Sequence, residues 1–137
     1  MPIKKLLALD VGEKRVGLAL ADSSIRIAIP FGYFERSSQI IQQITEVMLQ
    51  HNINTVVVGY PRNQSGEATK QTEAVEAFAD ELAKIELDAD LVFQDESLTS
   101  VEAERRLGRV EDKGLIDAEA ASIILQDYLE ENYGQPI

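Results

Sequence analysis

The chain has 137 residues and a mass of 15.2 kDa, with 45% hydrophobic and 27% charged residues, which is typical of one globular domain and excludes a disordered chain. It contains no cysteine, which excludes disulfides, thiolate zinc sites and cysteine nucleophiles. The net charge of −11 argues against a broad, non-specific nucleic-acid binder, because such proteins are usually basic.

The first pair of elements is a predicted hairpin. Residues 5–10 and 16–21 read as two apolar strands, and residues 11–15 form a polar turn between them. The apolar run that follows the basic start ends at Asp10, so it is too short for a signal peptide or a membrane span. We therefore expect a cytoplasmic protein that makes no membrane contact.

The middle of the chain alternates between strands and helices. Residues 27–34 read as a third strand, which Pro30 and Gly32 assign to an edge or bulged position. A helix over residues 39–51 follows, with Ser37 and Ser38 as candidate caps, and then a short buried strand over residues 55–58. The expected buried face of this helix consists of Ile40, Ile44, Val47 and Met48.

The second half begins with residues 59–66, a loop by composition. The pattern then predicts a helix over residues 68–84, a strand over residues 91–93 that closes on Asp95 and Glu96, and a helix from Thr99 to about residue 109. Asp117 is predicted to open the last helix. The expected buried faces of the first and last of these helices are Val75, Phe78, Ala79 and Leu82, and Ala121, Ile124, Leu125, Tyr128 and Leu129.

This order of elements predicts an α/β fold: a mixed sheet with helices packed on its faces, in one domain over residues 1–137. In such sheets, ligands bind outside the carboxyl ends of the strands. Asp10 ends the first strand, the Asp95–Glu96 pair ends the last, and Asp117 begins the final helix. We therefore expect these carboxylates to form one site.

A cluster of carboxylates needs cations to stay ionised, because like charges repel. Oxygen ligands without histidine or cysteine nearby favour Mg²⁺ or Mn²⁺ over zinc. Two such ions about 4 Å apart would activate a water molecule and stabilise the leaving oxygen of a phosphodiester. Gly12, two residues after Asp10, would let the backbone turn sharply and a ligand approach closely.

Each acidic residue also has a purely structural interpretation. Asp10 could bond its own backbone in the turn, Glu96 could be a solvated strand end, and Asp117 could cap its helix. The capping and metal-binding roles of Asp117 are compatible, and Asp95 is interpreted as a supporting residue beside Glu96.

The charge is divided unevenly along the chain. Residues 1–67 carry seven lysines and arginines against six acidic residues, whereas residues 68–137 carry six against eighteen. A polyanion should therefore meet the N-terminal half, which contains Lys14, Arg15, Arg26, Arg36 and Arg62. Of these, Lys14, Arg15 and Arg62 are the candidates for contact with phosphate, with an ordinary solvated role as the alternative for each.

Four segments together resemble one known family. They are DVGEKRVG (residues 10–17), VVGYPRNQSG (57–66) followed by Gln71, DESLTS (95–100) and DAEAASIILQDYL (117–129). In this order and spacing they resemble the YqgF family, also called RuvX, from residue 5 to about residue 129. The family's members are described as nucleases of precursor 16S rRNA that are related to Holliday-junction resolvases.

The resemblance implies a ribonuclease-H-like fold with a five-stranded mixed sheet and helices on both faces. It implies that Asp10, Glu96 and Asp117 are the catalytic, metal-binding residues, with Gly59, Pro61 and Gly66 in a loop beside them. The implied activity is metal-dependent cleavage of structured nucleic acid, with precursor rRNA as substrate and branched DNA as the alternative. The implied oligomeric state is a monomer or a homodimer. The chain departs from the family pattern at Ser97, where the family usually has arginine. Arg62 or Arg15 would then make the contact with phosphate that this arginine would provide.

Two other classes of function start from the same residues. Sugar kinases and actin-like ATPases also hold Mg²⁺ and phosphates with an Asp-x-Gly hairpin, but they need two such domains, and this chain supplies one. A non-catalytic module that keeps the fold and binds RNA or protein is the remaining alternative, and both the acidic charge and Ser97 favour it.

Overall fold

The computed structural model describes residues 2–61, 69–85, 88–96, 103, 105–108 and 112–136. Its centre is a five-stranded mixed sheet in the order β3-β2-β1-β4-β5. The strands are β1 (Lys5–Val11), β2 (Arg15–Asp22), β3 (Ile29–Glu35), β4 (Thr55–Pro61) and β5 (Asp90–Glu96). The helices are α1 (Ile40–Gln50), α2 (Lys70–Ala83) and α4 (Lys113–Asn132). Because β1, β4 and β5 are parallel, their carboxyl ends meet at one edge of the sheet.

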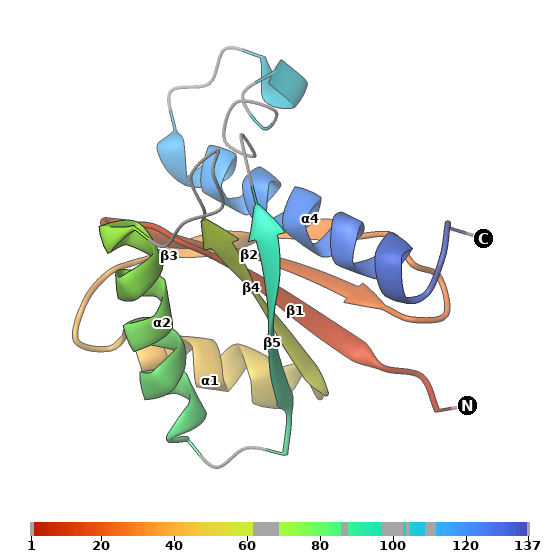
Figure 1. Ribbon diagram of the computed structural model, residues 1–137, viewed down its shortest axis with the longest axis horizontal. Coiled ribbons are helices and arrows are strands. Elements are labelled where there is room, and N and C mark those ends of the chain that lie inside the picture. Colours follow the sequence, from red (N-terminus) through yellow and green to blue (C-terminus); the bar gives the residue numbers. More distant parts are fainter. Residues whose placement is uncertain are drawn as a thin grey trace.

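Helices cover both faces of this sheet, with α4 on one face and α1 and α2 on the other (Figure 1). Leu7 and Leu9 of β1 pack in one buried cluster with α1 and α2. Leu6 and Ala8 pack in a second cluster with α4. Side chains of a strand alternate between its two faces, so Asp10, the next residue in the second series, lies on the α4 face. The predicted two-faced α/β architecture is thus confirmed.

The predicted buried helix faces are also confirmed. Spacings of three and four residues place apolar side chains on one side of a helix, where they pack on the sheet. The buried side chains of α1 are Ile40, Ile44, Val47 and Met48, and those of α2 include Val75, Phe78, Ala79 and Leu82. In α4, Ala121, Ile124, Leu125 and Leu129 are buried, and the partly buried Tyr128 packs against them. Among the helices that the structure describes, none is both long and apolar enough to span a bilayer.

Strand β3 lies at the edge of the sheet and carries an irregularity, as Pro30 and Gly32 predicted. It pairs with β2 through Leu18 and Gly32, and the register then shifts, so that Ala19 faces Pro30. Proline has no N–H to donate, and the outer edge of a sheet is where its absence costs least.

The predicted start of the last helix was wrong. Helix α4 begins at Lys113, and the side chain of Asp112 caps it by accepting the Gly114 N–H at 2.9 Å. Asp117 therefore lies inside the helix rather than at its cap. Gly114 lies in the first turn of this helix, and the ring of Tyr33 occupies the space that a Cβ would fill, which explains a glycine at this position.

The strand boundaries near the site also differ from the prediction. Gly59 and Pro61 were predicted to lie in a loop, but β4 continues through them because Gly59 pairs with Gln94, and Pro61 with Glu96, of β5. The predicted serine caps of α1 were wrong as well, since Gln39 occupies the cap position without a side-chain hydrogen bond. Residues 103 and 105–107 are helical, whereas the rest of the helix predicted over residues 99–109 lies outside the described residues.

Candidate active site

Helix α4 crosses β2 very closely at Gly17. A Cβ built on Gly17 would overlap the carbonyl group of Asp117 and the backbone nitrogen of Ala118. Gly17 is also the register partner of Asp10 in the β1–β2 hairpin. The missing side chain of one glycine thus lets the backbone of Asp117 rest on the sheet beside Asp10, although 107 positions separate the two acidic residues in the chain.

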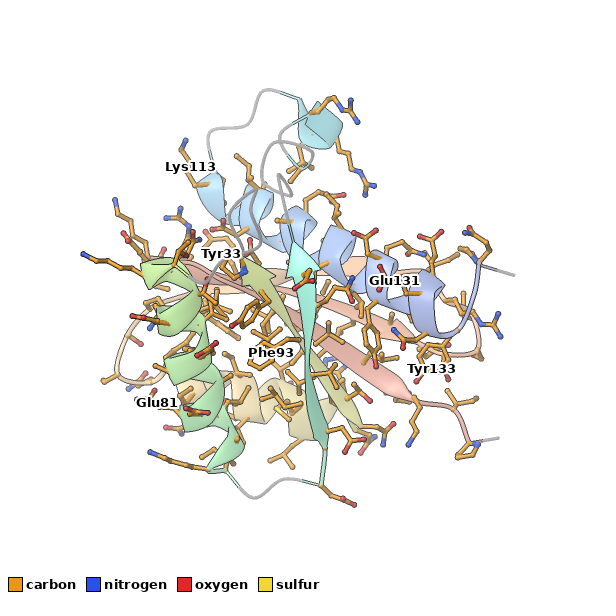
Figure 2. The ribbon with its side chains drawn as sticks, viewed as in Figure 1. Tyr33, Glu81, Phe93, Lys113, Glu131 and Tyr133 are labelled. Carbon is orange, nitrogen blue, oxygen red and sulfur yellow. The ribbon has the colours of Figure 1, made fainter. Side chains whose placement is uncertain are left out.

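A tyrosine helps to hold the first turn of α4 in this position. The ring of Tyr33 packs against Gly114, and its hydroxyl donates to the cap residue Asp112 at 3.3 Å. Figure 2 shows Tyr33 and Lys113 at the same end of α4. The negative charge of Asp112 raises the pKa of the Tyr33 hydroxyl and so favours the protonated form that donates this bond.

Arg15 forms an ion pair with Asp117. Its Nε atom lies 2.8 Å from Oδ2 of Asp117, and the two side chains are only 22% and 23% exposed. This hydrogen-bonded carboxylate raises the pKa of the guanidinium above its usual value. The sequence placed Arg15 among candidate phosphate contacts, and the structure shows that it also holds one of the candidate metal ligands.

The carboxyl ends of β4 and β5 complete this edge of the sheet. Gly59 is buried, and Pro61 pairs with Glu96 at the last position of both strands. The Pro61 carbonyl accepts the Thr72 hydroxyl at 2.6 Å, which ties the start of α2 to the end of β4. Asp95 is exposed. The side chain of Glu96 lies outside the described part of the structure, as do Arg62 and Gly66.

The hairpin turn between β1 and β2 closes at Gly12. The Gly12 N–H bonds to the carbonyl of Arg15 at 2.9 Å, and the Gly12 carbonyl accepts Nη1 of Arg36 at 2.8 Å. A Cβ on Gly12 would approach the Arg15 carbonyl to 3.0 Å, which explains a glycine at this turn. Lys14, at the tip of the turn, is exposed.

Two of the three carboxylates expected to bind a hard divalent cation belong to the described part of the structure. Asp10 and Asp117 supply carboxylate oxygens near the edge where β1, β4 and β5 end, and such oxygens are the ligands that Mg²⁺ and Mn²⁺ prefer. Within the described residues, no group of three or more histidine, aspartate or glutamate side chains is arranged to hold a metal ion. The third carboxylate expected from the sequence is that of Glu96, which belongs to the undescribed part.

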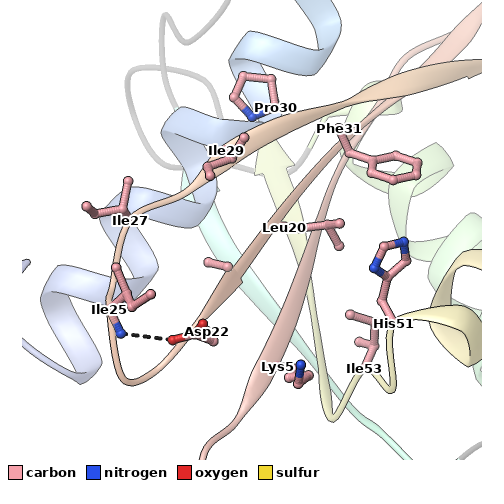
Figure 3. Close-up of a pocket in the computed structure, with 11 residues that line it drawn as sticks. Lys5, Leu20, Asp22, Ile25, Ile27, Ile29, Pro30, Phe31, His51 and Ile53 are labelled. Carbon is pink, nitrogen blue, oxygen red and sulfur yellow. Dashed lines mark hydrogen bonds between the residues drawn. The ribbon is translucent and has the colours of Figure 1, made fainter.

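A different cavity lies at the opposite end of the sheet, where β1 begins and β2 ends. It has a volume of about 390 Å³ and is lined mostly by apolar side chains, including several from the segment between Ile25 and Phe31 (Figure 3). Its charged lining residues are Lys5 and Asp22, and the ring of Phe31 packs edge-on against His51. It holds no cluster of carboxylates, so the chemistry expected of this chain is not located there.

Asp22, in the wall of this cavity, fastens the turn after β2. Its Oδ1 accepts the Ser24 hydroxyl at 2.6 Å, the Ser24 N–H at 2.9 Å and the Ile25 N–H at 2.8 Å (the last drawn in Figure 3). Hydrogen bonding by the Ser24 hydroxyl and the Ile25 N–H lowers the pKa of this carboxyl. A carboxyl whose pKa is lowered by folding stabilises the folded state above its unfolded pKa and loses this effect as the pH falls through the folded value.

We expect Asp22→Ala to lower the free energy of unfolding by about 1 kcal/mol at pH 7, since it removes the acceptor of these bonds. The difference from wild type should shrink in acid as Asp22 becomes protonated. Urea unfolding at pH 7 and near pH 2.5 measures both values. Asp22→Asn, which keeps an oxygen acceptor without the charge, should lose less than the alanine variant at pH 7. Equal losses at both pH values would contradict the role of the charge.

A family model described as "RuvX: Holliday junction resolvase" matches residues 4–131. This chain belongs to the RuvX family. A relative from Chloroflexus aurantiacus is 41% identical over 138 residues, covering 96% of this chain and 90% of its own length. Another from Synechocystis is 43% identical over 131 residues, covering 90% and 86%. Both carry the name "Putative pre-16S rRNA nuclease".

Solved structures show the same fold. The RuvC protein of T. thermophilus, in complex with a Holliday junction substrate, superimposes with a TM-score of 0.57 at 16% identity, covering 98% of this chain and 99% of its own. The Fowlpox virus resolvase, in a complex with Holliday junction DNA, gives a TM-score of 0.58 at 9% identity, covering 93% and 97%. This RuvX chain therefore has the ribonuclease-H-like fold of these resolvases, as the sequence resemblance predicted.

Sequence reasoning assigned no role to Gly17, although it ends the quoted DVGEKRVG segment. A glycine inside a predicted strand is itself a signal, because it marks a bulge or a close approach of another backbone. The partner in that approach, Asp117, could not be read from the sequence. Arg36 was noted for its charge alone, and nothing in the sequence indicated its bond to Gly12.

Proposed function

We propose that this RuvX-family protein is a metal-dependent endonuclease that hydrolyses phosphodiester bonds in structured nucleic acid and processes the 5′ end of precursor 16S rRNA. The observation that carries the proposal is the contact between Gly17 and Asp117, which brings Asp117 to the same face of the sheet as Asp10. The membership in the RuvX family and the names of its relatives support the reaction class and the substrate.

In this proposal, Asp10, Glu96 and Asp117 hold two Mg²⁺ or Mn²⁺ ions. When bound, such ions lower the pKa of water and stabilise a leaving oxygen. The position of Asp10 at the end of β1, on the α4 face, supports its part in the site, and Glu96 ends β5 at the same edge. Gly12, Gly59, Pro61, Gly66 and Asp95 shape the site around these carboxylates.

Lys14, Arg15 and Arg62 hold the phosphate backbone of the substrate in this scheme. Arg15 also has a second role, because its Nε atom pairs with Oδ2 of Asp117 at 2.8 Å. When substrate and metal ions bind, the guanidinium can exchange this carboxylate for a phosphate. A carboxylate and a phosphate can each accept two parallel N–H groups of a guanidinium.

The direct test is a cleavage assay on precursor 16S rRNA, with Mg²⁺, Mn²⁺ and EDTA in separate reactions. We expect cleavage near the 5′ end of the mature rRNA with either metal ion and none with EDTA. Cleavage that continues unchanged in EDTA would contradict metal dependence. If the folded protein binds the RNA but leaves it uncut under all conditions, the non-catalytic alternative replaces the nuclease.

A second substrate is favoured by a specific observation, since two of the structures that share the fold are complexes of resolvases with Holliday junctions. Branched DNA therefore belongs in the same assay. Cleavage of the junction at a higher rate than the RNA would assign the activity to DNA.

The Arg15–Asp117 pair makes a prediction about metal binding. We expect Arg15→Gln to bind Mn²⁺ severalfold more tightly than wild type, because it removes a cation that competes for Asp117. Isothermal titration calorimetry measures the Kd without any substrate, and Lys14→Gln, which removes a charge without this contact, is the matched control. Weaker Mn²⁺ binding by Arg15→Gln would mean that Arg15 instead holds Asp117 in its ligating position. The folding stability should change little, as for other ion pairs near the protein surface.

A further inference from the structure

A groove lined by both charged and apolar residues lies beside the hairpin turn, on the face of the sheet opposite Asp10. It has a volume of about 430 Å³ and is lined by Gly12 and Glu13 of the turn, by Arg36 after β3, and by Lys70 and Gln71 in the first turn of α2. Val11 also contributes to its wall, so the groove opens on the α1/α2 face of the sheet. The turn that contains Gly12 separates this groove from Asp10, two residues earlier.

Arg36 is the cation of this groove for which the structure shows fixed contacts. Its backbone N–H bonds to the Lys14 carbonyl at 2.8 Å, and its Nη1 donates to the Gly12 carbonyl at 2.8 Å. The guanidinium also lies over the ring of Phe78, with its central carbon 5.1 Å from the ring centroid. These contacts fix the orientation of a side chain that remains exposed to solvent. Much of the entropy that an arginine loses on binding a ligand has therefore been lost already.

The donors that remain suit an anion. A guanidinium has five N–H groups in a fixed planar fork, and the Gly12 carbonyl takes one of them. Lys70 adds a second positive charge to the lining, at the start of α2, where the helix dipole also favours an anion. Glu13 opposes this charge, so the groove suits an anion that both basic side chains can reach while it stays clear of Glu13.

We infer that this groove binds the phosphodiester backbone of the nucleic acid on one side of the bond that is cut, with Arg36 and Lys70 as the phosphate contacts. The inference rests on the proposed nuclease function and extends it to the path of the substrate. The strand passes from the carboxylates over the exposed tip of the turn at Lys14 and enters the groove beside Gly12. Arg36 and Lys70 are positioning residues in this arrangement, since they act on a phosphate that does not react.

The test measures binding of a short, fluorescently labelled single-stranded RNA in EDTA by anisotropy, over a series of salt concentrations. We expect Arg36→Gln to bind about tenfold more weakly and to reduce the slope of log K against log salt concentration by about 0.7, the value of one lost phosphate contact on a single strand. Lys70→Gln should lose affinity and slope in the same way. Glu13→Gln should bind more tightly, because it removes the opposing charge.

Lys84→Gln is the matched control. Lys84 follows the far end of α2, so this substitution removes one positive charge at a distance from the groove. Arg36→Gln with the affinity and salt slope of Lys84→Gln would overturn the inference. Thermal unfolding checks that each variant is folded. If Arg36→Gln does not fold, the opposite effects of Lys70→Gln and Glu13→Gln still decide the question, and the absence of either effect would overturn it.

Cleavage kinetics separate this inference from the proposed function. Under the proposal, Arg36→Gln raises KM and leaves kcat within about twofold of wild type, because the interaction is the same in ground and transition states. RNA that the folded wild-type protein binds but leaves uncut in Mg²⁺ and Mn²⁺ would overturn the nuclease function and leave the binding result standing. Normal RNA binding by Arg36→Gln, together with loss of cleavage in Asp10→Asn, would overturn only the inference that the groove binds the phosphodiester backbone.

Discussion

Asp10→Asn is expected to lower the rate of precursor rRNA cleavage by at least about 100-fold in Mg²⁺. Replacing even the outer partners of metal ligands typically costs 10- to 100-fold, so loss of a direct ligand should cost no less. The reason is chemical, since an amide has one oxygen and no charge where the carboxylate would neutralise a divalent cation. Initial rates of cleavage, measured at saturating RNA, give the ratio.

The matched control for this variant is Asp80→Asn, which removes one negative charge from the exposed face of α2. It should cleave at the wild-type rate. Asp10→Asn should keep its fold, because Asp10 is only partly buried and the amide has nearly the same shape as the carboxyl. Undiminished cleavage by a folded Asp10→Asn would exclude the carboxylate from the reaction and leave the turn interpretation of this residue.

Gly17→Ala should have the largest effect on stability. The added methyl would overlap the carbonyl of Asp117, and backbone atoms of a helix packed on a sheet can move away only by shifting the helix. Overpacking of this kind typically costs about 1–3 kcal/mol. Because the same shift moves Asp117 away from Asp10, cleavage should also fall in molecules that remain folded. Urea unfolding and single-turnover cleavage below the unfolding transition measure the two effects.

Gly114→Ala provides the comparison for Gly17→Ala. Its Cβ would meet the ring of Tyr33, a side chain that can rotate, and alanine is the better helix former by about 1 kcal/mol. We therefore expect a smaller loss of stability than for Gly17→Ala. A larger loss for Gly114→Ala than for Gly17→Ala would show that the tyrosine, rather than the helix crossing, sets the position of α4.

Local patterns in the sequence were sufficient to predict how the helices and the sheet are layered. The spacing of apolar residues reports which side of a helix is buried, and this depends only on the helical period, so the faces of α1 and α2 were predicted correctly. The irregular edge strand followed from Pro30 because a missing N–H is a local property. Asp10 stood out for the same kind of reason, as a carboxylate at the end of an apolar strand.

Boundaries that depend on distant partners were predicted less well. Strand β4 runs through Gly59 and Pro61, residues that favour loops, because β5 lies beside them and pairs with their backbone. Helix α4 starts before Asp117 because Asp112 caps it and Tyr33 packs on Gly114. In each case a tertiary contact outweighed the local preference of the residues.

The sequence by itself therefore determined the α/β class, the two-sided packing of the sheet and the acidic residues Asp10 and Glu96 near the ends of β1 and β5, because periodicity and composition are local properties of the chain. Only the tertiary structure decided which acidic residues lie on the same face of the sheet. Asp117 lies on the face that carries Asp10, and pairs with Arg15, because Gly17 lets a helix from the other end of the chain lie directly on β2. That contact depends on the distance between two backbones, which no pattern within a single segment records.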